Sequence, residues 1–147
     1  MNPLAAFDYV TKHRSVADQI VGDLADDELS CFAMDLMRMY SYAARRMLSE
    51  IGWLATISML HEIRENGDDP NQRDAAWLIL AYEAWNDTTG VDFGAEDLSQ
   101  KFHTATLFGR LVAVIAAIPA VWRLLLPQLA TPGGQDMLQH FVLEEIE

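Results

Sequence analysis

The sequence has few residues of the kinds that mark several large protein classes. Only one of its 147 residues is cysteine, Cys31, so an intramolecular disulfide is excluded. A single cysteine in an apolar stretch is typical of a small buried side chain in a reducing compartment. Basic residues are also scarce, since 10 Lys and Arg stand against 22 Asp and Glu and give a formal net charge of −12. That balance argues against direct binding of nucleic acid through its phosphates.

Long hydrophobic runs are missing as well. The charge-free stretch near the C-terminus covers 12 residues, 111–122, whereas a membrane-spanning helix needs about 20. The first residues lack the basic region of a signal peptide, and Asp8 interrupts their apolar run. These absences predict a cytoplasmic protein that does not contact a membrane.

Motifs that identify common catalytic or cofactor sites are absent from the sequence. It contains no Gly-x-Ser-x-Gly, no Gly-x-Gly-x-x-Gly and no glycine-rich phosphate loop. The four histidines lack the His-Glu-x-x-His and Glu-x-x-His spacings of zinc and di-iron sites. His61 has Glu65 one turn later, a pattern more typical of a surface salt bridge. We therefore expect no catalytic residues, no bound metal and no cofactor.

Helical periodicity runs through most of the chain, and no apolar/polar alternation is long enough to predict a strand. We expect an all-α fold, a single-domain bundle over residues 1–147 with about six to seven helices. Its core is expected around segments 27–66 and 107–126. The predicted helices cover residues 4–13, 15–24, 27–66, 69–86, 95–118 with an extension to 129, and 135–146.

Local signals place several boundaries between these helices. Asp69 and Pro70 are typical of an N-cap and a first helical residue. Pro119 is expected to kink or restart its helix. Segment 27–66 would form an unusually long central helix, so we expect a bend near 49–52 or a division into two helices. Its apolar positions follow helical spacing as far as Leu54 and predict a buried stripe.

Methionines and tryptophans gather in two of the predicted helices. Segment 34–59 holds five of the seven methionines. Methionine fills irregular gaps in a core, but a Met-rich surface also binds apolar partners, and this segment could form a homodimer interface. Trp77, Ala81 and Trp85 share one helix face, where tryptophans anchor either a core or a protein interface.

Acidic residues concentrate in the middle of the chain. Residues 67–100 carry eight acids and one base, so they hold 8 − 1 = 7 of the 12 excess negative charges. Many of these acids lie at predicted helix starts, where they favour solubility and helix formation. The alternative is an acidic surface that attracts a basic protein partner. The residues predicted to form that surface are Asp68, Asp69, Asp74, Trp77, Glu83, Trp85, Asp87, Asp92 and Phe93.

These features favour a non-enzymatic, acidic, protein-binding regulator or inhibitor that docks on a basic, nucleic-acid-handling protein. In size, acidity and helix content the chain resembles inhibitors that phages and other mobile elements direct against host nucleases, including anti-CRISPR proteins. That likeness is one of general character, and no signature residue carries it. One alternative is a structural homodimer or assembly subunit that uses segment 34–59. Another is a helical enzyme or small-ligand carrier with a site among His61, Glu65, His103 and Trp53.

Overall fold

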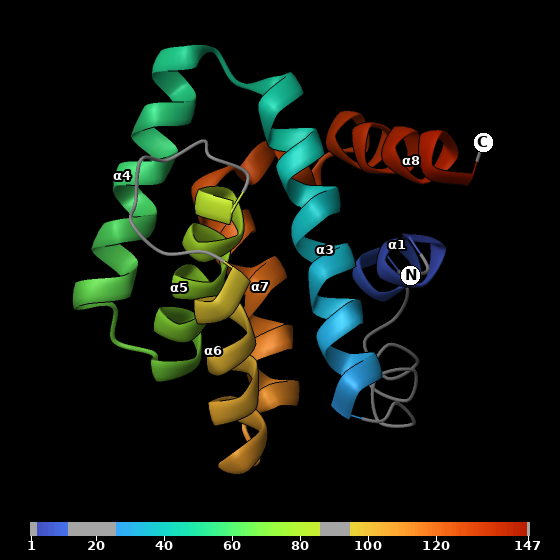
Figure 1. Ribbon diagram of the computed structural model, residues 1–147. Helices are drawn as coiled ribbons and strands as arrows, with labels where there is room; N and C mark the ends of the chain where they lie inside the picture. Colours follow the sequence, from blue (N-terminus) through green and yellow to red (C-terminus); the bar gives the residue numbers. More distant parts are fainter. Residues whose placement is uncertain (1–2, 12–25, 86–94, 147) are drawn as a thin grey trace. The chain divides into compact units, whose positions relative to one another are not determined.

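The computed structural model describes residues 3–11, 26–85 and 95–146, and the regular structure in them is helical (Figure 1). The predicted all-α class is confirmed. The described elements are α1 (Pro3–Thr11), α3 (Asp26–Met47), α4 (Glu50–Asn66), α5 (Pro70–Trp85), α6 (Ala95–Leu107), α7 (Leu111–Leu125), the 3-10 helix η1 (Pro127–Ala130) and α8 (Pro132–Ile146). The helix predicted over 15–24 lies outside these residues. None of the described helices is long and apolar enough to span a bilayer.

The chain divides into two compact units. Unit 1 comprises Met1–Ser49 and Trp122–Glu147, and it contains α1, α3, η1, α8 and the last residues of α7. Unit 2 is the continuous stretch Glu50–Val121, which contains α4, α5, α6 and most of α7. The single domain predicted over 1–147 stays a prediction.

The predicted long central helix is two helices, α3 and α4. The Leu48 N–H still donates to the Ala44 carbonyl at 2.9 Å, and the helical conformation then ends. Helix α4 begins at Glu50, whose carboxylate is favourable at a helix N-terminus. The predicted interruption is therefore confirmed, and it is a full break at residues 48–49.

Unit 1 is built around α3, which packs against α1 and α8 (Figure 1). Met37 and Met39 of α3 are buried in the core, whereas Met34 and Met47 are only partly buried. Aromatic pairs, which stabilise contacts beyond the apolar area that they bury, also join elements of unit 1, including the end of α7 that carries Trp122. The ring centroids lie 5.1 Å apart in Tyr9–Phe32, 6.1 Å apart in Tyr40–Trp122 and 5.4 Å apart in Tyr42–Phe141.

Cys31 of α3 is exposed, so its predicted burial is wrong. It follows the exposed Glu28 by three residues and therefore shares its helix face. The buried stripe of α3 instead contains Leu29, Phe32 and Leu36. The apolar neighbours of Cys31 in sequence belong to another side of the helix.

Unit 2 is built around α5, which packs against α4 and α6. The α4–α5 turn confirms the predicted helix start. Asp69 Oδ1 accepts a hydrogen bond from the Asn71 N–H at 2.8 Å, as an N-cap side chain does. Across the turn, Arg73 donates to the Gly67 carbonyl at 2.7 Å. These two bonds hold a short turn in which Asp68 and Asp69 are both exposed.

The helix does not restart at Pro119, which was one of the two predicted outcomes there. The chain breaks ten residues earlier, at Gly109, which has a φ of 66° in the left-handed region that favours glycine. The Gly109 N–H donates to Thr106 at 3.0 Å and the Arg110 N–H donates to Ala105 at 2.8 Å, a Schellman C-cap. Pro119 instead lies buried inside α7, which continues past it to Leu125.

The last helix begins earlier than predicted. The sequence predicts a helix from residue 135, but α8 starts at Pro132. The Thr131 hydroxyl accepts the Gly134 N–H at 3.3 Å, and the Thr131 carbonyl accepts the Gln135 N–H at 2.9 Å. Pro132 takes the first helical position, where its missing N–H removes no helical bond.

Candidate protein-docking surface

The residues predicted from sequence to form a docking surface differ widely in exposure. Asp68, Asp69 and Trp85 are exposed, whereas Asp74 and Trp77 are partly buried and Glu83 is fully buried. The other three, Asp87, Asp92 and Phe93, lie outside the described residues. The structure therefore does not present the predicted set as one exposed surface.

Asp74 and Trp77 contribute to the internal packing of unit 2. The Asp74 carboxylate forms ion pairs with Lys101 Nζ at 2.8 Å and with Arg110 Nη2 at 2.6 Å. Lys101 Nζ also lies 5.4 Å from the centroid of the Trp77 ring, in a cation–π contact. Arg110 donates to Asn71 Oδ1 at 3.2 Å as well. The negative charge of Asp74 is thus balanced inside the unit and is a weak attractant for a partner.

The assignment of Glu83 to a surface is wrong in this structure, because its side chain has an exposed fraction of 0%. It follows Ile79 by four residues and Ala76 by seven, and both are buried on the same face of α5. A carboxylate at this position adds no exposed charge to the protein.

Helix α4 has an exposed apolar face that the sequence analysis placed in the core. The exposed fractions are 81% for Ile51, 66% for Leu54 and 48% for Met59. The buried residues of α4 are Thr56, Ile57 and Leu60 on the opposite side. The break at residues 48–49 explains the error, because the buried stripe of α3 does not continue in phase into α4.

The same face of α4 becomes acidic toward its C-terminus. Positions 51, 54, 58, 62 and 65 recur every three or four residues and form one band along the helix. Its last two members are glutamates, and two aspartates follow in the α4–α5 turn. We define the α4 surface as the exposed Ile51, Leu54, Glu62 and Glu65 of this band, together with Met59 at its edge and Asp68 and Asp69 in the turn that follows.

The carboxylates of the α4 surface are only partly balanced by neighbouring groups. Glu65 pairs with Arg64 at 3.1 Å, and Glu62 accepts a hydrogen bond from Asn66 at 3.0 Å. Within the described residues, neither Asp68 nor Asp69 has an ion pair.

Two of these acids also oppose the helix dipole. Glu62 and Glu65 lie at the C-terminal end of α4, where a negative charge is unfavourable by about 0.3–1 kcal/mol. Helix stability alone would favour basic residues there. Local rules of this kind are most often broken at functional sites.

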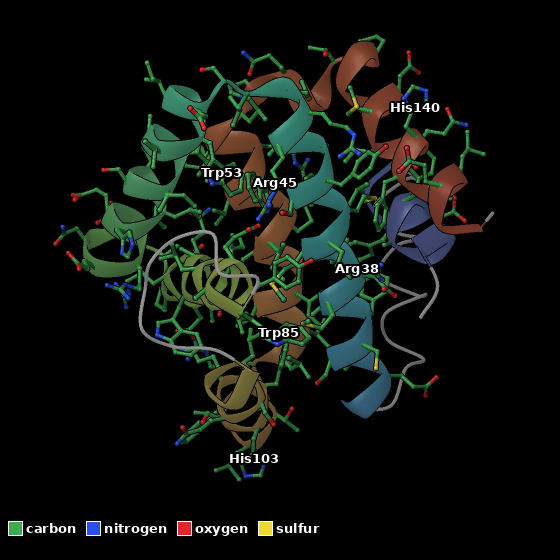
Figure 2. The ribbon with its side chains drawn as sticks, turned by 45° about the horizontal axis from the view of Figure 1, so that its top comes forward. Arg38, Arg45, Trp53, Trp85, His103 and His140 are labelled. Atoms are coloured by element: carbon green, nitrogen blue, oxygen red, sulfur yellow. The ribbon has the colours of Figure 1, made fainter. Side chains whose placement is uncertain are left out.

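The alternative site among His61, Glu65, His103 and Trp53 does not assemble into a metal centre. Glu65 pairs with Arg64, and His103 is exposed on α6 and points away from it (Figure 2). His140 points outward from α8 in the same view. Among the described residues, no group of three or more His, Cys, Asp or Glu side chains could share a metal ion.

Unit 1 contains a small cavity of about 80 Å³. Tyr40 and Arg123 contribute its polar side, and burial raises the pKa of Tyr40, an effect that the nearby Arg123 charge opposes. Pockets for small organic ligands usually measure about 300–1,000 Å³. This cavity therefore gives little support to the ligand-carrier hypothesis. Its lining residues are Val10, Thr11, Tyr40, Arg123, Leu129, Ala130, Gln135 and Leu138.

Comparison with known proteins identifies no relative. No family model matches the chain, and neither a curated protein nor a solved structure matches it.

Proposed function

We propose that this protein is an acidic, non-catalytic regulator that binds a basic protein partner through the α4 surface. The observation that supports this proposal is the continuous exposed band on α4, apolar in its first half and acidic in its second. The proposal retains Asp68 and Asp69 from the sequence prediction. It replaces the other predicted contact residues with side chains of α4.

The two halves of the α4 surface would contribute differently to binding. Burial of Ile51, Leu54 and Met59 would supply affinity, since removal of apolar area from water drives most protein association. The four carboxylates would mainly increase the association rate with a positively charged partner. Proteins that bind nucleic acid carry such basic surfaces. A regulator that covers one would act as an inhibitor, as we propose for this chain.

The proposal is tested by affinity capture from a lysate of the source organism. The tagged wild-type protein is compared with Asp68→Lys, and retained proteins are identified after low-salt and high-salt washes. Asp136→Lys on α8 is the matched control, because it makes the same charge change at another exposed position. We expect the wild-type protein to capture a basic partner that the high-salt wash releases. Asp68→Lys should capture several-fold less of this partner than Asp136→Lys does.

Equal loss of the partner with both variants would show that only net charge matters and would reject the α4 surface. If a partner is captured, its activity on nucleic acid is then measured with and without the protein. Unchanged activity would reject inhibition while leaving the interaction itself in place.

A further inference from the structure

We infer that the partner segment recognised by the α4 surface is a basic amphipathic helix that packs along α4. This inference rests on the proposed function and specifies the chemistry of the partner. It follows from the spacing of the exposed residues, from the small side chains between them and from the position of the acids.

The exposed apolar positions of α4 have the spacing of a helix-packing face. Ile51, Leu54, Ala55 and Ser58 are all exposed and occupy positions i, i+3, i+4 and i+7 of α4, with Met59 beside this face. Large side chains that alternate with small ones form ridges and grooves, and a second helix fits its own side chains into such grooves. Recognition of a helix in this way uses anchors at positions i, i+3, i+4 and i+7 of the bound segment.

The acidic half of the surface specifies the charge of that segment. From Ile51 to Glu65, α4 rises about 21 Å at 1.5 Å per residue. A partner helix of about 15 residues would therefore contact both halves of the surface. Its apolar anchors would lie against Ile51 and Leu54, and Lys or Arg side chains would lie against Glu62, Glu65 and Asp68.

A second copy of this chain is a poorer occupant than a basic helix. It would bring its own acidic α4 and a further net charge of −12 toward the first copy. Stable homodimers usually bury large and mainly apolar interfaces. The α4 surface is a single helix face whose second half carries carboxylates.

The experiment uses a synthetic peptide of about 18 residues as the probe. The peptide carries leucines at i, i+3, i+4 and i+7, followed by four Lys or Arg, because basic residues stabilise the C-terminal turn of a helix. Binding of the fluorescein-labelled peptide to the full-length protein is measured by anisotropy at low and high salt. A scrambled peptide of the same composition, which has no apolar stripe, is the control for charge alone.

Matched protein variants then test each half of the surface. We expect Leu54→Glu to weaken peptide binding at least tenfold, and Leu143→Glu, at a comparably exposed position on α8, to change it less than twofold. We expect the double variant Glu62→Lys/Asp68→Lys to remove most of the salt dependence. Equal affinity for the scrambled peptide, or no effect of Leu54→Glu, would overturn the inference.

Two further measurements separate this inference from the proposed function. If the natural partner depends on Asp68 but the designed peptide neither binds nor competes with it, the regulator proposal stands and the helix inference fails. If sedimentation of the protein alone shows a dimer that Leu54→Glu dissociates, a second copy occupies α4 and the inference is also overturned. Binding of the designed peptide together with competition against the captured partner would support both.

Discussion

The two units differ in how they use their large apolar side chains. Among the described residues, nine large apolar side chains are exposed. Seven of them, Ile51, Leu54, Met59, Trp85, Leu107, Phe108 and Val112, belong to unit 2, and only Leu124 and Leu143 belong to unit 1. Exposed apolar area is therefore concentrated in unit 2, the unit that carries the proposed α4 surface.

Two arginines of unit 1 lie over aromatic rings of the same unit. The Arg38 guanidinium lies 5.6 Å from the centroid of the Phe141 ring, and that of Arg46 lies 3.5 Å from the centroid of the Tyr42 ring. Both contacts join residues of unit 1 to one another. In unit 2 the exposed Ile51 and Leu54 of α4 are followed by carboxylates along the same helix face.

The comparison is tested most strongly by two tryptophans, one from each unit. Trp122 has an exposed fraction of 0% and stacks on Tyr40, so Trp122→Ala should lower the free energy of unfolding by about 3–5 kcal/mol. Trp85 is 53% exposed, and Trp85→Ala should lower it by about 0.5 kcal/mol or less. Urea unfolding followed by circular dichroism measures both. Similar losses would contradict the contrast between the units.

The second prediction concerns the internal charge pairing of unit 2. Asp74→Asn removes the ionic part of the contacts with Lys101 and Arg110. The pairs are partly exposed, so we expect a loss of about 1–2 kcal/mol in urea unfolding. Asp68→Asn, at an exposed position, should stay within about 0.5 kcal/mol of wild type. A loss that is no greater for Asp74→Asn would show that Asp74 is as free for docking as Asp68.

The third prediction concerns pH and the core of unit 1. Burial raises the pKa of Tyr40 above its ordinary value of 10.0, with the nearby Arg123 charge opposing the shift. The folded state thus favours the protonated form of Tyr40. The resulting contribution to the free energy of unfolding is complete below pH 10 and is lost as the pH rises further. The free energy of unfolding should fall by up to about 1.4 kcal/mol per pH unit above 10.

The control for this prediction is Tyr40→Phe, which should flatten the alkaline decline. A weaker decline should remain, because partial burial and a hydrogen bond to Glu144 raise the pKa of Tyr42 as well. Equal slopes for wild type and Tyr40→Phe in urea unfolding between pH 9 and about pH 11 would reject the role of Tyr40.

The smallest expected effect is at the α6–α7 corner of unit 2. Gly109→Ala places a Cβ at a φ of 66° and should lower the free energy of unfolding by about 1 kcal/mol. Beyond its own chain neighbours that Cβ meets no atom within 4 Å, so the loss would be conformational. Gly133→Ala in α8 is the control, since its φ is ordinary and its surroundings are open. Equal effects of the two variants would show that the left-handed conformation of Gly109 does not cause the loss of stability.

Local signals in the sequence were sufficient for much of the fold. Asp69 is predictable as an N-cap because capping is a local interaction. Its hydrogen bond reaches a residue only two positions away. Gly109 and Pro119 are both helix-breaking types, and the sequence analysis chose the proline. The structure shows α7 continuing through a buried Pro119, and such accommodation depends on packing that periodicity does not report.

The candidate site was less predictable, because it depends on contacts between residues far apart in sequence. The partners of Asp74 lie 27 and 36 residues away, at Lys101 and Arg110. Nothing in the local sequence distinguishes this aspartate from the exposed Asp68. The apolar face of α4 was missed for a related reason, since its spacing fits a core stripe equally well until the neighbours of α4 are known.

The composition of unit 1 from two separate stretches of chain has a consequence for protein synthesis. Tyr42 leaves the ribosome 141 − 42 = 99 residues before its ring partner, Phe141. At about 5–20 residues per second, that interval lasts roughly 5–20 s. All of unit 2 is translated within it. The side of α3 that packs against α8 therefore remains without this neighbour until α8 itself has been translated.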